Sequence, residues 1–372
     1  MNRREFLVFG GGLAAAALAG PAAPAQPGDE WRNRQAGMSY RRLGRTGFMV
    51  SEFACGGNTI SPTSNDHVRL ALDMGLNYLD TAPAYGRGES ERGYAAVIAG
   101  SASRQRVFLA TKVSPWDINR AEVFQKMFDS LADSQQKRVR GEAAEYLKSV
   151  PGEKSDYFGS YFPSQWGEVE KAALANVMDR RYGSRLDKRK EYYGLIIQSV
   201  EDSLKRLDTD YVDVLHCPHG ANTPGEMEVP EVFEAFERLK KAGKVRHLGF
   251  SSHSNPAETL RAAVANGMYS LGMIAYSITN HEAVDAVLEE ARAKDVGVIA
   301  MKSARPVWPG GNRPPAAAVR VEKLQRAVPG EMKVPMKAYL WVLRNPNIAA
   351  VNSELINADM VRDNLPLAGR KL

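Results

Sequence analysis

The chain has 372 residues, of which 44% are apolar and 25% charged, a composition typical of a globular protein that argues against wholesale disorder. Its net charge of +6 comes from scattered basic residues, and no basic helix face interleaved with aromatic side chains points to nucleic acid. Two cysteines, Cys55 and Cys217, are too few for a disulfide framework, and the sequence has no CxxC pair to hold a metal ion. The length suffices for one large domain with additions.

Residues 1–25 have the pattern of an export signal. Arg3 and Arg4 precede an apolar run over residues 8–19, and Ala23-Pro24-Ala25 then forms a cleavage site of small residues. The run is too short and too weakly apolar to be a good membrane span. Arg-Arg-x-Phe-Leu resembles a twin-arginine signal, so we expect an exported, periplasmic protein cleaved near Ala25. The alternatives are an ordinary Sec signal and retention at the membrane by an uncleaved signal. Residues 26–37 are expected to be a polar linker.

From residue 38 onward, short apolar runs alternate with segments of helical periodicity, an order that predicts parallel βα units. Eight runs are expected to be strands: 51–56, 77–80, 107–112, 211–215, 247–251, 272–276, 297–302 and 348–352. Helices are expected over 66–74, 199–207, 230–241, 256–266, 281–294 and 336–343. The sequence therefore predicts an α/β fold, a (β/α)8 TIM barrel over residues 38–372, with its chemistry where the strands end.

Three polar residues stand at or just after neighbouring strand ends. Asp80 ends the second strand, Tyr85 follows it, and Lys112 ends the third. A phenol titrates near pH 10, about three units too high for easy proton exchange at neutral pH. A nearby ammonium stabilises the phenolate and lowers its pKa, and a carboxylate can hold that ammonium in place. These residue types predict a proton-donating unit for general acid catalysis.

The order and spacing of several segments resemble the aldo/keto reductase family. The resemblance is carried by residues 40–47, an N-terminal hairpin, and by residues 79–91, 206–213, 249–253 and 298–302. It covers nearly everything from Met38 to Leu367 except one insertion. It implies an oxidoreductase that transfers a hydride between a nicotinamide cofactor and a small aldehyde, ketone or alcohol, with a sugar-like substrate as one option. The alternative is a non-catalytic binding or regulatory protein on the same scaffold.

The resemblance implies that the phenol is the general acid/base and that the ammonium and the carboxylate tune it. The family also has a histidine five residues beyond the aspartate of the fourth strand, here Asp213, but Pro218 occupies that position. His219 fits if Pro218 is a one-residue insertion or bulge. The side chain of His216 is on the same face of the strand as that of the expected position, but His216 lies two residues earlier and therefore deeper in the barrel. His219 is the preferred catalytic candidate, and His216 stays the alternative.

By the same resemblance, the cofactor lies at the later strand ends. The residues implied to bind it are Ser251, Ser252, His253, Met301, Lys302, Glu354, Asp363 and Asn364. The family often has an amide at the position of Met273, which would hold the nicotinamide carboxamide. The family favours NADP(H). Glu354 and Met360, however, stand where the extra phosphate is usually received, and a carboxylate suits a ribose diol and repels a phosphate. NAD(H) therefore stays open, and no metal is implied.

An insertion after the third strand, residues 115–192, is far longer than the roughly 2–6 residues of an ordinary βα connection. It has a helical, polar pattern with an aromatic, turn-rich middle at residues 155–163. Because βα loops lie on the catalytic face, the insertion is placed to act as a lid and specificity element. The alternative is an outlying helical hairpin that serves as an oligomer contact.

Overall fold

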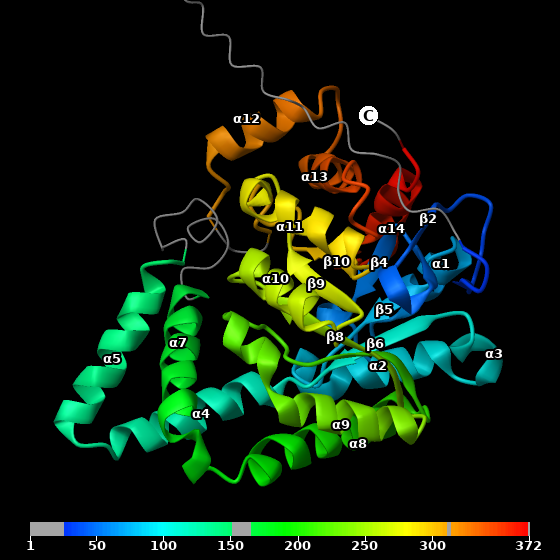
Figure 1. The fold of residues 1–372 in the computed structure, drawn as a ribbon. Coiled ribbons are helices and arrows are strands. Elements are labelled where there is room, and N and C mark those ends of the chain that lie inside the picture. The colour runs from blue at the N-terminus through cyan, green and yellow to red at the C-terminus, as the bar shows by residue number, and fades with distance from the viewer. Residues whose placement is uncertain (1–25, 151–164, 311–313, 371–372) are drawn as a thin grey trace, which may run out of the picture.

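The structure is a computed structural model that describes residues 26–150, 165–310 and 314–370, so the expected export signal lies outside the described residues. Its centre is a closed barrel of eight parallel strands in the order β10-β11-β4-β5-β6-β7-β8-β9 (Figure 1). The strands are β4 (Phe53–Gly56), β5 (Tyr78–Asp80), β6 (Phe108–Lys112), β7 (Val212–His216), β8 (Val245–Ser252), β9 (Leu271–Ala275), β10 (Gly297–Met301) and β11 (Ala350–Ser353). Each corresponds to one expected apolar run, which confirms the predicted TIM barrel.

Helices connect the strands and cover the outside of the barrel (Figure 1). They are α1 (Asp66–Asp73), α2 (Glu89–Ile98), α3 (Ser101–Arg104), α8 (Leu195–Leu207), α9 (Pro230–Lys241), α10 (Pro256–Asn266), α11 (His281–Ala293), α12 (Ala318–Ala327), α13 (Val334–Leu343) and α14 (Ala358–Asn364). Helix α9 shows why such segments fold against the sheet. Its buried residues Val232, Ala235, Phe236 and Leu239 recur at helical spacing and form one apolar stripe.

A small three-stranded sheet closes the floor of the barrel, the end where the strands begin. It comprises β1 (Glu30–Trp31), β2 (Tyr40–Arg42) and β3 (Phe48–Ser51), with β3 antiparallel to β2 and parallel to β1. Phe48 reaches into the barrel and stacks on Phe108, with ring centroids 4.2 Å apart. This contact joins the core of the barrel to the small sheet.

Part of the segment expected to be a linker belongs to this floor. Arg32, which follows β1, forms an ion pair with Asp213 of β7 at 3.1 Å, and Arg104 and Arg246 bind the same carboxylate at 2.9 and 2.8 Å. Asp213 is fully buried. Burial raises its pKa, but the neighbouring arginines and the Leu109 N–H outweigh burial and lower the pKa below its ordinary value. The folded domain therefore includes residues before 38, because β1 pairs with β3 and Arg32 is one of three arginines that bind the buried Asp213.

The described residues of the insertion form three long helices, α4 (Pro115–Asp129), α5 (Asp133–Leu147) and α7 (Gln165–Tyr182), followed by a π-helical turn over Arg189–Gly194. Helices α5 and α7 pack side by side and project from the barrel at the lower left of Figure 1. The insertion is nevertheless attached to the barrel. Asn176 on α7 accepts a hydrogen bond from Arg120 at 2.8 Å and donates one to Thr223 at 2.7 Å.

Candidate active site

A cavity of about 840 Å³ opens at the carboxyl ends of the strands, where a barrel of this type carries its chemistry. Its wall is built by the ends of β4, β5, β10 and β11 with the loops that follow them, by the loops after β7 and β8, and by α13. Eight residues singled out from the sequence line it: Asp80, Tyr85, His219, His253, Met301, Lys302, Glu354 and Met360. The barrel thus brings together residues that are up to 280 positions apart in the chain (Asp80 to Met360).

A buried ion pair lies at the base of this cavity. In the β5–β6 register Asp80 is opposite Ala110, so Lys112, two residues further on, has its side chain on the same face of the sheet. Lys112 Nζ donates to Asp80 Oδ1 at 2.5 Å and to the Thr81 carbonyl at 2.8 Å. Both side chains are at most 2% exposed. Burial raises the pKa of Asp80 and lowers that of Lys112, and the charge of each partner opposes that shift.

Tyr85 begins the short turn Tyr85–Gly88, five residues beyond the end of β5. The ammonium of Lys112 lies 4.9 Å from the centroid of the Tyr85 ring, over its face. The pKa of Tyr85 is raised well above its ordinary value, first by burial and then by the negative charges of Asp80 and Glu354. The expected net lowering of this pKa is not met, because burial and the neighbouring carboxylates dominate. The phenol is therefore protonated at neutral pH.

The structure separates the two candidate histidines. His219 lines the cavity, and its ring lies edge-on to that of Tyr85, with centroids 6.3 Å apart and an interplanar angle of 85°. His216 is fully buried below the cavity, where its Nδ1 donates to the Phe250 carbonyl at 3.0 Å. The pKa of His219 is held well below its ordinary value by burial, then by nearby positive groups of which Lys112 is the first, so the ring is neutral. The geometry favours His219 as the catalytic candidate.

Two serines expected to bind the cofactor have partners within the chain. Ser251 Oγ accepts from the Gly220 N–H at 3.0 Å, and Ser252 Oγ donates to the Ala221 carbonyl at 2.7 Å. Both serines are buried and neither lines the cavity. Their hydroxyls instead fix the loop that carries His219 against the end of β8. His253, the next residue in the chain, does line the cavity, and burial and then Lys302 lower its pKa to about 3.

The far end of the cavity contains only part of the expected adenosine site. Glu354 and Met360 line it, as the sequence predicts. Asp363 instead forms an ion pair with Lys333 outside the cavity. Asn364 is buried, with its amide 3.4 Å from Ser353 Oγ. The structure therefore does not bring Asp363 and Asn364 to the cavity wall.

Among the polar residues of the wall that had not been singled out, Asn352 and Ser303 have buried polar atoms. Asn352, near the end of β11, directs its amide nitrogen to Asp80 Oδ2 at 3.3 Å and to Met273 Sδ at 3.6 Å. Its Oδ1 and the Ser303 Oγ are buried and have no hydrogen-bond partner among the described residues. Buried polar atoms without partners are costly, so a cavity wall that has two of them suits a ligand with polar groups. The sequence signal for Asn352 is a polar residue that ends an otherwise apolar run.

The insertion reaches the rim of the barrel beside the site. Ser254, just after β8, donates to Gln165 Oε1 at the start of α7, at 2.6 Å. Val150 and Val169 form an apolar cluster with Ala275, the last residue of β9. Val150 and Gln165, which stand on either side of positions 151–164, therefore lie at the carboxyl ends of β9 and β8.

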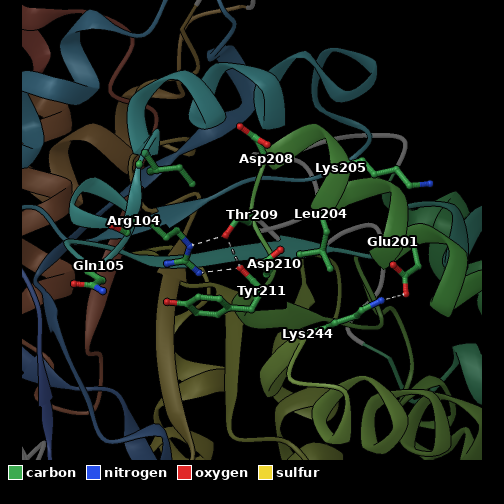
Figure 2. Close-up of a pocket in the computed structure, with 13 residues that line it drawn as sticks. Arg104, Gln105, Glu201, Leu204, Lys205, Asp208, Thr209, Asp210, Tyr211 and Lys244 are labelled. Atoms are coloured by element: carbon green, nitrogen blue, oxygen red, sulfur yellow. Dashed lines mark hydrogen bonds and ion pairs between the residues drawn. The ribbon is translucent and has the colours of Figure 1, made fainter.

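A second hollow, of about 710 Å³, lies at the other end of the barrel between α3, α8 and the start of β7 (Figure 2). Glu201 there forms an ion pair with Lys244, and the Arg104 guanidinium binds Thr209 Oγ1 and the Tyr211 carbonyl at 3.3 and 3.0 Å (Figure 2). These polar groups form ion pairs and hydrogen bonds with one another. The amino ends of barrel strands generally serve stability, and this hollow fits that pattern.

Comparisons with known proteins agree with the barrel fold. The model of the Aldo/keto reductase family matches residues 53–305. Aldo-keto reductase AMT2 of Alternaria alternata is 30% identical over 226 residues, which cover 58% of this chain and 49% of that protein. This chain spans about half the length of the curated relatives it matches.

Two solved structures share the fold. Aldo-keto reductase AKR11C1 from Bacillus halodurans, in its holo form, has a TM-score of 0.57 at 21% identity, over 90% of this chain and 92% of that one. An aldo-keto reductase from Klebsiella pneumoniae in complex with NADPH has a TM-score of 0.52 at 18% identity, over 90% and 91%. With the family model matched over more than half of its length, this chain belongs to the aldo/keto reductase family.

Proposed function

We propose that this protein is an exported NAD(P)-dependent oxidoreductase that transfers a hydride between a nicotinamide cofactor and a small aldehyde, ketone or alcohol, with sugar-like compounds among the candidates. The observation that carries the proposal is the meeting of Tyr85, His219 and the Lys112–Asp80 ion pair at one cavity. A protonated phenol beside a neutral imidazole and a buried charge pair is suited to general acid catalysis at a carbonyl oxygen.

The cavity fits a nicotinamide dinucleotide. Its volume of about 840 Å³ falls in the range of roughly 300–1,000 Å³ of known ligand sites. Lys302 and Arg305 line it, and cations of this kind suit a diphosphate. Met301 provides an apolar surface for a planar ring. Asn352 Oδ1 and Ser303 Oγ can accept hydrogen bonds from polar groups of the cofactor.

When bound, the nicotinamide supplies or accepts the hydride. In the reductive direction His219 orients the carbonyl oxygen, and Tyr85 donates its Oη proton to that oxygen as the carbon gains the hydride, so the carbonyl becomes an alcohol. The raised pKa of Tyr85 keeps the phenol in its acid form before the reaction. Lys112, over the face of the ring, stabilises the negative charge that develops on the phenol, and Asp80 holds Lys112 in place.

The family resemblance and the NADPH-bound neighbour support NADP(H) as the cofactor. Glu354 and Met360 at the far end of the cavity support NAD(H), because a carboxylate repels the extra phosphate. Titration of the apoenzyme with NADH and with NADPH, followed by fluorescence, decides between them. If Glu354 faces the phosphate position, Glu354→Gln will strengthen NADPH binding about tenfold and leave NADH binding nearly unchanged, an electrostatic effect of about 1.4 kcal/mol.

Export is proposed from Arg3, Arg4 and the small residues that end at Ala25. None of the helices among the described residues is long and apolar enough to cross a membrane. Replacing both arginines by lysine will leave a precursor in the cytoplasm if the twin-arginine route is used. A normally processed periplasmic product would instead support a Sec signal, and an unprocessed membrane-bound product would support retention by the signal.

The insertion is proposed to act as a lid and specificity element, because Gln165 and Val169 contact the rim at the ends of β8 and β9. The alternative is an oligomer contact through the projecting α5 and α7. Exchange of residues 133–182 for a short Gly/Ser loop separates the two roles. A changed ratio of kcat/KM between large and small substrates supports the lid. An unchanged ratio with a smaller assembly in light scattering supports the contact.

The decisive test of the proposed reaction is an absorbance and fluorescence scan of the exported protein for bound nicotinamide, with a carbonyl-reduction screen of wild type and Tyr85→Phe. The loss of the phenol proton should lower kcat by about 10²–10⁴-fold. Because the Tyr85 hydroxyl makes no hydrogen bond to the described residues, the free energy of unfolding should be nearly unchanged. Failure to bind either cofactor would support the alternative of a non-catalytic binding or regulatory protein.

A further inference from the structure

A single buried hydroxyl connects the backbone directly before Tyr85 with the imidazole ring of His219. Ser114 follows β6 and is 8% exposed. Its Oγ accepts a hydrogen bond from the Ala84 N–H at 3.3 Å, directly before Tyr85 in the chain. The same Oγ lies 2.9 Å from Nδ1 of His219. One oxygen thus binds both the turn that carries the phenol and the imidazole ring.

The donors and acceptors around this oxygen favour one direction for the hydrogen bond to the ring. The Ala84 amide can only donate, so it uses a lone pair of the hydroxyl. The hydroxyl proton then needs an acceptor, and among the described residues the hydrogen bonds of Ser114 leave only Nδ1 of His219 to receive it. A neutral imidazole has one protonated nitrogen, so an accepting Nδ1 places the proton on Nε2.

We propose that Ser114 is a positioning residue that holds His219 in the Nε2-protonated tautomer, so that the ring offers an N–H donor to the oxygen of the substrate. The proposal rests on the role of His219 in the proposed function. The neutral state of His219 agrees with its burial among Lys112, His253, His216 and Lys302, which disfavour a further positive charge. In a neutral ring the tautomer decides whether the free nitrogen donates to a carbonyl oxygen or repels it.

The same contact fixes the spacing of the two groups. The Tyr85 and His219 rings meet edge to face, at 6.3 Å and 85°. Ser251, through the Gly220 N–H, holds the His219 loop from its other side. The backbone of the Tyr85 turn and the ring of His219 are therefore both held by Ser114, and its loss frees the imidazole to rotate and to exchange tautomers.

The tautomer can be observed directly in the purified full-length protein, without turnover. The chain has six histidines, so ¹⁵N-histidine labelling gives a tractable spectrum, and His219→Asn identifies the signals of His219 by their disappearance. We expect a protonated Nε2 and an unprotonated Nδ1 in wild type and in Ser114→Thr, which keeps the hydroxyl. Ser114→Ala should give a mixture of tautomers. A protonated Nδ1 in wild type, or a Ser114→Ala spectrum identical to wild type, would overturn the proposal.

Kinetics provide the second measurement. Ser114→Ala should lower kcat by about 10- to 100-fold with little change in KM, less than the roughly 10²–10⁴-fold of general acid catalysis itself. Ser114→Thr should recover most of the rate. Ser51→Ala removes another buried serine hydroxyl, which lies in the small sheet at the floor of the barrel and donates to the Phe53 carbonyl, and should leave kcat unchanged. A wild-type kcat in Ser114→Ala would refute the positioning role.

The two measurements separate this inference from the proposed function. In one outcome, wild type reduces no carbonyl compound but shows the expected tautomer, which is lost in Ser114→Ala. This outcome contradicts the proposed reaction and supports the hydrogen bond from Ser114 to His219. In the other outcome, wild type is active but His219 is protonated at Nδ1. This outcome refutes the positioning role of Ser114 and remains consistent with the proposed reaction.

Discussion

Replacement of Lys112 by methionine should leave the carboxyl of Asp80 buried without its ion-pair partner. The two side chains are 2% and 1% exposed, and their atoms meet at 2.5 Å. The only other hydrogen bond to Asp80 from a described side chain is the longer one from Asn352, at 3.3 Å. Removing one partner of such a pair costs about 3–5 kcal/mol of folding free energy.

Protonation of Asp80 limits this cost. An aspartate of the unfolded chain has a pKa of about 3.9, and each pH unit above it costs about 1.4 kcal/mol if the folded carboxyl keeps its proton. The loss in Lys112→Met is therefore capped at about 4 kcal/mol at about pH 7 and about 1.5 kcal/mol at about pH 5. The folded state binds the extra proton, so the stability of the variant falls as the pH rises. In wild type the trend has the same sign but is weaker, because Lys112 opposes the burial of Asp80.

Urea unfolding of both proteins, followed by far-ultraviolet circular dichroism at several pH values between about 5 and 7, measures this difference. The double variant Asp80→Asn/Lys112→Met is the control: it buries no charge, so it should regain most of the stability and lose the pH dependence. A Lys112→Met deficit that stays below about 1 kcal/mol, or that is the same at both ends of the pH range, would refute the reasoning.

Asp213→Asn should cost about 3–5 kcal/mol, because Arg32, Arg104 and Arg246 lose a buried counter-charge. The folded state lowers the pKa of Asp213, so the stability advantage of wild type should be present above about pH 3.9 and should be lost as the pH falls through the folded pKa. The acid unfolding curves of the two proteins should therefore converge. Gly44→Ala should cost at least about 3 kcal/mol, because φ is +50° and the new Cβ would lie 2.2 Å from the Gly297 nitrogen. Gly141→Ala, in the exposed middle of α5 with no atom near the new Cβ, should instead gain up to about 1 kcal/mol in thermal unfolding. Equal melting temperatures for the two alanine variants would contradict the packing seen at the floor.

The barrel could be predicted because each strand is a short apolar run bounded by turn residues. The run predicted at residues 272–276 is strand Leu271–Ala275, a shift of one residue. Strand Glu30–Trp31 could not be predicted in this way. It has two residues, it exists through its pairing with β3, and the ion-pair partner of the neighbouring Arg32 lies 181 positions away. Such contacts have no local signal.

The same distinction applies to the candidate active site, where residues with a local sequence signal could be predicted and residues whose role depends on distant contacts could not. Asp80, Tyr85 and Lys112 could be named from their places at strand ends. The choice between His216 and His219 needed the positions of the two rings. Ser114 and Asn352 gave no comparable signal, because serine and asparagine at the end of a strand are also ordinary turn residues. Their importance comes from contacts across the barrel. The direction of the Tyr85 pKa shift depends on burial, which spacing does not report.

The first described residues lie at the floor of the barrel, and this position determines where a tag, a fused domain or a solid support is connected to the molecule. Gln26 donates its backbone N–H to Asp29, and Asp29 is held by Arg42 on β2, so the chain enters the domain at the floor. Any tag, fused domain or solid support joined ahead of residue 26 is therefore connected at the end opposite the cavity. A protein anchored by this end presents its open face outward, where substrates arrive.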